Sequence, residues 1–185
     1  LIGNAVSHRR SDYFLFTKCG HSSGLGLPDW DPVMLTQSID RSLQRLKTDR
    51  VDLVQLHSCS KELLEKGEVI EVLQEAKRAG KTRYIGYSGD GLDALCAIEL
   101  GVFDSLQTSV NIADQECLTL TLPRAQEAGM GVIAKRPIAN VAWRTGNARP
   151  TNGYVLPYWE RLQTLQYEFL YDQDLPASVG TALRF

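Results

Sequence analysis

Two side chains with the chemistry of catalytic groups stand at the ends of apolar segments. Lys18 follows the run Tyr-Phe-Leu-Phe-Thr, and His57 follows the run Val-Asp-Leu-Val-Gln-Leu. A lysine ammonium near an imidazole can stabilise a developing oxyanion or lower the pKa of a third, acidic group. Each residue alone has an ordinary explanation, since lysine commonly marks where a strand reaches water and histidine often has a structural role. Together, at the ends of neighbouring strands, they favour a catalytic interpretation.

Further polar side chains occupy the same kind of position along the chain. Ser88 ends a third apolar segment, a fourth carries Gln107, and a fifth runs into Lys135 and Arg136. In folds built from parallel strands, the active site forms at the carboxyl ends of the strands. These residues therefore extend a predicted ring of polar groups at one end of an apolar sheet.

Five short segments rich in β-branched, aromatic and aliphatic residues are expected to form the strands that position these groups. They cover residues 13–18, 51–57, 82–88, 105–111 and 131–135. Strands that alternate with helices indicate βαβ units and a parallel sheet, so we predict an α/β fold. An open doubly wound sheet and an eight-stranded barrel both fit this pattern.

Apolar residues at helical spacing separate the strand segments. The stripes run over residues 35–46, 69–76, 92–96, 122–128 and 158–169, and residues 1–10 resemble the end of an amphipathic helix. Asp31 and Pro32 provide an N-cap and a first-turn proline for the first stripe.

The composition describes an ordinary globular chain and excludes several classes of function. The 185 residues carry 20 basic and 22 acidic side chains, a net charge of -2, and 43% of them are hydrophobic. This balance gives no electrostatic reason to expect a nucleic acid or an anionic membrane surface as a partner. No apolar run approaches the about 20 residues that a membrane helix needs. Four scattered cysteines indicate reduced thiols, and hence a cytoplasmic protein, rather than a disulfide scaffold.

The motifs do not favour a metal, phosphate-loop or hydrolase site. Cys19, His21, His57 and Cys59 lie near two strand ends, but Cys-x-His and His-x-Cys are unusual zinc spacings, so we expect no metal. The glycine-containing loop 19–30 has neither G-x-G-x-x-G nor a P-loop. The G-x-S-x-G nucleophile elbow of many α/β hydrolases is missing too.

Longer stretches of the sequence resemble the aldo-keto reductases. Residues 38–57 (SIDRSLQRLKTDRVDLVQLH) are similar to the helix-into-strand signature of that family, and this match is long and specific. Residues 80–88 (GKTRYIGYS) resemble the next strand and residues 16–18 (FTK) the preceding one. Residues 131–139 (GVIAKRPIA) resemble the strand that leads into the cofactor loop. The resemblance runs in register over the whole chain.

The resemblance implies a (β/α)8 TIM barrel that uses NADPH, without a metal, to reduce aldehydes and ketones. The family has a catalytic tetrad of Asp, Tyr, Lys and His, in which Lys18 matches the lysine and His57 the histidine. In the family, the tyrosine protonates the carbonyl oxygen as hydride arrives, and the lysine lowers the pKa of that tyrosine. The histidine orients the substrate carbonyl.

The resemblance also implies residues that bind the cofactor NADP. Ser88 and Gln107 match residues that hydrogen-bond the nicotinamide carboxamide, and Lys135 and Arg136 lie where the chain enters the cofactor loop. Two positions depart from the family pattern. Gly89 stands where the family often has an asparagine, and Lys135 stands where many members place an aromatic ring against the nicotinamide.

The chain is expected to cover only part of the family's barrel. No aspartate here is followed five residues later by a tyrosine, so the Asp-x-x-x-x-Tyr segment of the tetrad is expected upstream. The last barrel strand, which binds the adenosine 2′-phosphate in the family, is expected downstream. Residues 1–185 then form one partial barrel domain with five of the eight strands, without the N-terminal strands and the C-terminal strand.

These features predict NADPH-dependent reduction of a small aldehyde or ketone, with this chain inactive on its own because it has no matching tyrosine. One alternative is a non-catalytic barrel of the same superfamily that acts as a binding or regulatory subunit. Another is a five-stranded flavodoxin-like binding domain. The loops 19–30 and 141–157 are expected to determine which carbonyl compound binds.

Overall fold

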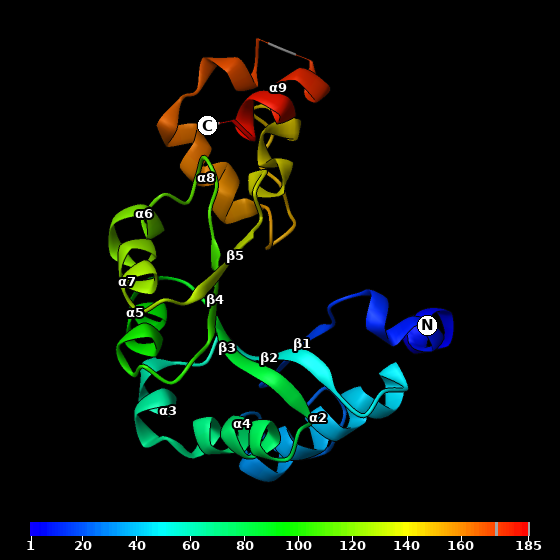
Figure 1. Cartoon of the computed structure of the whole chain (residues 1–185). Coiled ribbons are helices and arrows are strands. Elements are labelled where there is room, and N and C mark those ends of the chain that lie inside the picture. The colour runs from blue at the N-terminus through cyan, green and yellow to red at the C-terminus, as the bar shows by residue number, and fades with distance from the viewer. Residues whose placement is uncertain (173, 185) are drawn as a thin grey trace.

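The computed structural model describes residues 1–172 and 174–184, which fold around a curved parallel sheet (Figure 1). The strands are β1 (Phe16–Cys19), β2 (Val51–His57), β3 (Thr82–Ser88), β4 (Ser105–Ser109) and β5 (Gly131–Lys135). They lie in the order β1-β2-β3-β4-β5, each parallel to the next. A sequential order without reversal is that of a barrel arc and not of a doubly wound sheet. The predicted barrel architecture is confirmed for these strands, and the flavodoxin-like alternative is wrong.

Helices connect successive strands and cover the outer side of the sheet (Figure 1). They are α2 (Pro32–Leu46), α3 (Lys61–Lys66), α4 (Glu68–Arg78), α5 (Gly91–Glu99), α6 (Cys117–Leu120) and α7 (Leu122–Glu127). Asp31 caps α2 as predicted, because its carboxylate accepts the N–H of Met34 at 2.9 Å, and Pro32 begins the helix. The predicted N-terminal helix is short: α1 (Ile2–Val6) continues as the 3-10 segment η1 (Ser7–Asp12).

The main hydrophobic core lies between the sheet and the outer helices. Alternate strand residues contribute to it, among them Val54, Leu56, Ile85, Tyr87 and Leu106, and α2 and α4 contribute Leu35, Ile39, Val69 and Leu73. Because successive strand residues point to opposite faces, burial of this set fixes the other set on the concave face of the sheet.

A second hydrophobic cluster, here called the C-terminal cluster, forms after β5. It is built from η2 (Ala139–Thr145), α8 (Leu156–Leu165), η3 (Glu168–Leu170) and α9 (Leu175–Ala182). Trp143 lies at its centre, 3% exposed, and its indole donates to Ser178 Oγ at 3.0 Å. The cluster continues from the end of β5, away from the helices that cover the sheet (Figure 1).

Two strands differ in length from the sequence prediction. β1 begins at Phe16 rather than at residue 13, because the N–H of Leu15 is bound at 2.8 Å by the carboxylate of Asp52 and not by a strand carbonyl. β4 ends at Ser109 rather than at residue 111. The side chain of Asn111 turns the chain there by accepting two backbone N–H groups, at 2.9 and 3.0 Å.

The sequence patterns missed three short helices and overextended one longer helix. The missed helices α3, α6 and α9 have 6, 4 and 8 residues, too few for a repeated apolar stripe. The predicted stripe 158–169 breaks because α8 ends at Leu165, Gln166 adopts a left-handed φ of 52°, and Phe169 lies in η3. In the described part of the chain, no helix has the length and apolar character needed to cross a membrane.

Candidate functional site

The register of the sheet brings four of the sequence-predicted site residues to one face. Paired Cα positions in parallel strands carry their side chains on the same face. Lys18 pairs with Gln55, which lies two positions before His57. His57 pairs with Ser88, and Ser88 pairs in turn with Gln107. The four side chains therefore share the concave face, near the carboxyl ends of β1 to β4.

The side chain of Lys135 also lies on the concave face of the sheet, whereas Arg136 follows the end of β5 and points toward Tyr158. The register partner of Lys135 is Ser109, on the concave side of β4. The Lys135 ammonium donates to Asp90 Oδ2 at 2.9 Å, and only 15% of the lysine side chain is exposed. Arg136 follows the strand with a positive φ of 56° and donates to Tyr158 Oη at 3.1 Å. Both cations predicted to bind a cofactor are therefore engaged with protein groups.

Burial, and then nearby positive charge, lowers the pKa values of two side chains at this end of the sheet. Burial, followed by the nearby Lys135 ammonium, lowers the pKa of Lys18. Burial is also the main reason that the pKa of His57 lies below its ordinary value of 6.5. The charges of Lys18, His21, Lys135 and Arg136 lower the pKa of His57 further. His57 is therefore neutral at pH 7, and its ring can donate one hydrogen bond to a carbonyl oxygen.

A second histidine lies against His57, although the sequence analysis considered it only as a metal ligand. The ring centroids of His21 and His57 are 5.6 Å apart in an edge-to-face arrangement. His21 Nδ1 lies 2.8 Å from Asp29 Oδ2, and Asp29 Oδ1 accepts the N–H of Ser22 at 2.7 Å. The ring of Trp30 also meets His21, with centroids 5.6 Å apart. His21 is thus held by its own loop in front of His57.

Trp30 closes the loop that carries His21. Its N–H donates to the carbonyl of Gly20 at 3.0 Å, and a Cβ at Gly20 would lie 2.5 Å from the indole. Gly20 also has a positive φ of 147°, so glycine is required there on two grounds. The Gly-His pair after Lys18 and the Asp-Trp pair at the end of the loop are the sequence signals for this arrangement.

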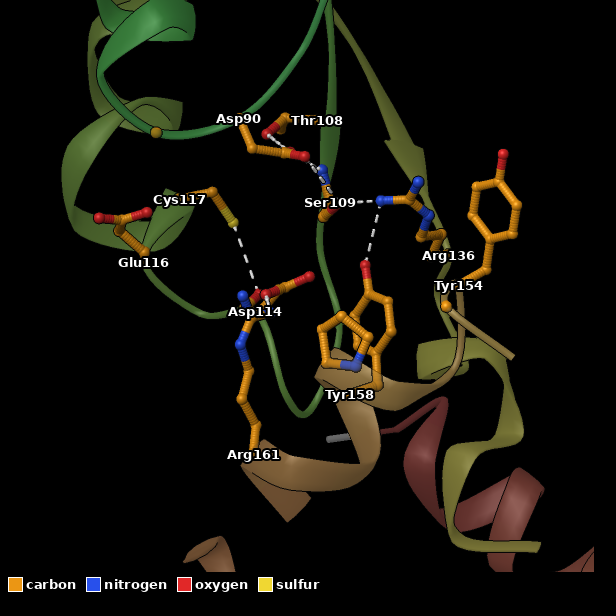
Figure 2. Close-up of a pocket in the computed structure, with 13 residues that line it drawn as sticks. Asp90, Thr108, Ser109, Asp114, Glu116, Cys117, Arg136, Tyr154, Tyr158 and Arg161 are labelled. Atoms are coloured by element: carbon orange, nitrogen blue, oxygen red, sulfur yellow. Dashed lines mark hydrogen bonds and ion pairs between the residues drawn. The ribbon is translucent and has the colours of Figure 1, made fainter. Parts of the chain in front are cut away.

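Asp90 forms one wall of a cavity of about 250 Å³ beside the site (Figure 2). Its carboxylate accepts the N–H of Ser109 at 2.7 Å and the hydroxyl of Thr108 at 2.9 Å. Burial alone would raise the pKa of Asp90, but the hydrogen bond from Ser109 and the charge of Lys135 lower it on balance. Asp90 is therefore a fixed negative charge that holds the Lys135 ammonium.

Tyr158 stands across the same cavity, between two arginines (Figure 2). The guanidinium carbons of Arg136 and Arg161 lie 5.9 and 5.7 Å from the centroid of its ring, within the range of cation–π attraction. Arg161 pairs with Asp114. The charges around this cavity are thus largely satisfied within the protein.

Ser88 and Gln107 present polar side chains on the concave face. Ser88 is 1% exposed and Gln107 is half-buried, and the two are register partners on adjacent strands. Within the described residues, neither side chain makes a hydrogen bond. The amide of Gln107 therefore has a donor and an acceptor available on the concave face, which is the chemistry that a carboxamide requires.

The cysteines near the site belong to the core. Cys19 and Cys59 are buried, and burial raises the pKa of each thiol to about 12. Thiols in this state are protonated at neutral pH and are poor metal ligands. Over residues 1–172 and 174–184, no group of three or more His, Cys, Asp or Glu side chains is placed to hold a metal ion.

Known sequences resemble this chain over most of its length. The profile of the aldo/keto reductase family matches residues 1–167. L-galactose dehydrogenase of Arabidopsis thaliana is 36% identical over 144 residues, which are 73% of this chain and 44% of that protein. The uncharacterized oxidoreductase YqkF of Bacillus subtilis is 31% identical over 144 residues, which are 75% of this chain and 46% of that protein. The chain spans about half the length of these curated relatives.

Solved structures share the fold. The aldo-keto reductase AKR11C1 from Bacillus halodurans, in its holo form, aligns with a TM-score of 0.71 and 26% identity over 96% of this chain and 64% of that chain. An aldo/keto reductase from Klebsiella pneumoniae in complex with NADP and acetate aligns with a TM-score of 0.62 and 23% identity over 80% and 50% of the two chains. The second likeness supports the fold alone.

Proposed function

This chain belongs to the aldo/keto reductase family of oxidoreductases, and we propose that it carries the catalytic lysine and histidine of an NADPH-dependent carbonyl reductase. The proposed catalytic residues are Lys18 and His57. Ser88 and Gln107 are proposed to bind the cofactor. One observation carries the proposal: the register of β1 to β4 brings these four side chains to the same face and the same end of the sheet.

Each of these residues has a distinct role in the proposed reaction. NADPH, when bound, supplies the hydride to the carbonyl carbon. The neutral ring of His57 donates an N–H to the carbonyl oxygen and so orients the substrate. Lys18 places a positive charge where negative charge develops, either on that oxygen or on an acidic group beside it. Ser88 and Gln107 hold the carboxamide of the nicotinamide.

The reaction also requires a proton donor at the carbonyl oxygen, which we propose to be a tyrosine outside residues 1–185. No aspartate of this sequence has a tyrosine five residues later. Tyr87 is unsuited, because it points into the core, donates its hydroxyl to the carbonyl of Cys59 at 2.6 Å and has a pKa raised by burial. Residues 1–185 alone are therefore proposed to be inactive.

Lys135 and Arg136 complete the proposed cofactor side of the site. Lys135 is held by Asp90 at the concave face, where its ammonium would lie beside a bound cofactor. Arg136 would first have to release Tyr158. Because Lys135 and Arg136 are already bound to protein groups, we propose that they contribute less to cofactor binding than Ser88 and Gln107 do.

A small carbonyl compound is the proposed substrate and NADP(H) the proposed cofactor. The relative from Arabidopsis acts, by its name, on the sugar L-galactose, which is consistent with a small polar substrate. Four free, buried cysteines fit a protein of the reducing cytoplasm. The balanced charge of the sequence offers no attraction to nucleic acid or to an anionic membrane.

NADPH oxidation with a simple aromatic aldehyde tests this function. The assay compares residues 1–185 with the protein expressed from its whole reading frame, and turnover is expected only from the latter. An active 1–185 chain would show that the catalytic groups are assigned wrongly. A whole protein that binds NADPH but reduces no carbonyl compound would instead favour the regulatory-subunit alternative.

A further inference from the structure

A second cavity lies beside Lys18 and His57, between the His21 loop and helix α2. Its volume is about 190 Å³. Basic side chains predominate among its nine lining residues, which are Lys18, His21, Arg41, Arg45 and His57 together with Cys19, Ser23, Ser38 and Ser42. None of these described lining residues carries a carboxylate. In a chain whose net charge is -2, this is a local concentration of positive charge.

The cations of this cavity are not neutralised by the protein. Within the described residues, Lys18 and Arg45 make neither a hydrogen bond nor an ion pair. Arg41 donates through Nη1 to the carbonyl of Ser23 at 3.1 Å and through Nη2 to the carbonyl of Ser22 at 3.5 Å. These bonds hold its guanidinium at the loop without neutralising its charge. The guanidinium fork of Arg45, which is unoccupied within the described residues, presents the geometry that carboxylate and phosphate groups bind through paired hydrogen bonds.

The carboxylate of Asp29, in the His21 loop, binds groups of that loop rather than the lysine and arginine side chains of the cavity. Asp29 accepts the N–H of Ser22 and lies 2.8 Å from His21 Nδ1. The backbone hydrogen bond from Ser22, and then His21, hold the pKa of Asp29 below its usual range. Asp29 therefore stays ionised as the partner of His21 and does not line the cavity.

We propose that this cavity binds an anionic group, a carboxylate or a phosphate, of the carbonyl substrate. The inference rests on the proposed function and names its substrate class: a small aldehyde or ketone that carries a negatively charged oxygen group. Arg45 binds the anionic group, and Arg41, held at the loop, adds its positive charge. Lys18 and His57, which line the same cavity, face the carbonyl end of the molecule.

Two matched pairs of aldehydes test this inference in the whole protein. Benzaldehyde is compared with 4-carboxybenzaldehyde, and glyceraldehyde with glyceraldehyde 3-phosphate. The anionic member of at least one pair is expected to have a kcat/KM about tenfold higher, through a lower KM, and the advantage should shrink in high salt. The pair that shows the preference distinguishes carboxylate from phosphate. Equal kcat/KM values within both pairs would overturn the inference.

Variants assign the preference to the cavity. Arg45→Met is expected to reduce kcat/KM about tenfold for the anionic aldehyde and to leave the neutral one within about twofold. The side chain of Arg45 makes no hydrogen bond to another described residue, so this variant should fold normally. Arg50→Met removes the same charge from an exposed position before β2, at the opposite end of the sheet, and is the matched control. If the two variants behave alike, the cavity does not bind the anion.

Failure of this inference can be told apart from failure of the proposed function. Calorimetry measures binding of benzoate and of inorganic phosphate to the whole protein without turnover. Binding that is about tenfold weaker in Arg45→Met supports the inference even where no aldehyde is reduced. Reduction of neutral aldehydes without any preference for anionic ones supports the proposed function and overturns the inference.

Discussion

The ring of His21 stands edge-on to the ring of His57, with the centroids 5.6 Å apart and the planes at 74°. Asp29 and Trp30 hold His21 from within the loop, so the orientation of His57 is determined by that loop as well as by its own strand. The loop 19–30, which is expected to determine substrate preference, therefore contacts His57, which is expected to orient the substrate carbonyl.

His21→Ala is expected to raise the pKa of His57. His21, Lys18, Lys135 and Arg136 all lower this pKa in addition to burial, so removing His21 weakens two causes at once. We expect an upward shift of the His57 pKa, measured by NMR titration of its ring in the whole protein. His8→Ala, which removes an exposed histidine of η1, should leave the titration unchanged. An unchanged pKa in His21→Ala would show that the two rings are not coupled.

Lys18→Met is expected to lower kcat about 100-fold in the whole protein with little change in KM. The reason is that Lys18 acts on charge that develops during the reaction, rather than on the bound substrate. Steady-state kinetics with NADPH and a neutral aldehyde measures both constants. Lys47→Met removes an exposed lysine after α2 and is the control. A rise in KM alone would mean that Lys18 only binds substrate.

Gln107→Ala is expected to weaken NADPH binding about tenfold, because the carboxamide loses its amide partner on β4. Fluorescence titration of the whole protein with NADPH gives the dissociation constant. Gln126→Ala, at an exposed position of α7, should bind as the wild type does. Equal affinity in the two variants would contradict the assignment of Gln107 to the cofactor.

Asp52→Asn is expected to destabilise the protein by about 2 kcal/mol near pH 7. The Asp52 side chain is 7% exposed and accepts from Arg10 at 2.7 Å and from the N–H of Leu15 at 2.8 Å, with Arg83 at 3.4 Å. Burial alone would raise the pKa of Asp52, but these partners lower it on balance. Thermal unfolding of the variant and of an Asp49→Asn control measures the difference.

The lowered pKa of Asp52 determines how its contribution to stability changes with pH. A carboxyl group whose pKa is lower in the folded state contributes stability above its unfolded pKa of about 3.9 and loses it as the pH falls through the folded value. The gap in unfolding temperature between wild type and Asp52→Asn should therefore narrow below about pH 4. A gap that widens on acidification would contradict the ion pairs seen here.

Residues 1–185 expressed alone are expected to self-associate. β1 and β5 are the outer strands of the described sheet, and the apolar side chains of Phe16, Tyr84 and Val132 are 52%, 48% and 45% exposed. Light scattering after size-exclusion chromatography should show oligomers, and Phe16→Lys with Val132→Lys should reduce them. Leu92→Lys changes a residue that is 71% exposed on α5 and serves as control. A soluble monomer that melts cooperatively would contradict this expectation.

The sequence predicted the elements that depend on local pattern and missed those that depend on long-range contacts. β2, β3 and β5 match their predicted residues, because each segment is rich in β-branched, aromatic or aliphatic residues and is bounded by turn-forming residues. The placement of Lys18 and His57 at one end of the sheet follows from the same runs. The ion pair of Lys135 with Asp90 could not be predicted, since it joins the ends of two strands that are not adjacent.

The position of His21 shows the same limit within a loop. Its orientation depends on the hydrogen bond of Trp30 to Gly20 and on the Asp29 carboxylate, neither of which follows a periodic pattern. Periodicity describes regular elements, and a closed loop has none. The spacing of Cys19 and His21 pointed only to a possible metal ligand, whereas His21 packs against the ring of His57.

The C-terminal cluster around Trp143 and the core behind the sheet bury separate sets of residues. Regions with separate cores exchange their backbone amides as independent cooperative units, so the C-terminal cluster can open while the sheet stays folded. Tyr158 belongs to that cluster, yet it also forms a wall of the cavity beside Asp90. The shape of that cavity therefore depends on temperature. Local unfolding of the C-terminal cluster would remove the wall that Tyr158 forms, while every residue of the sheet remained in place.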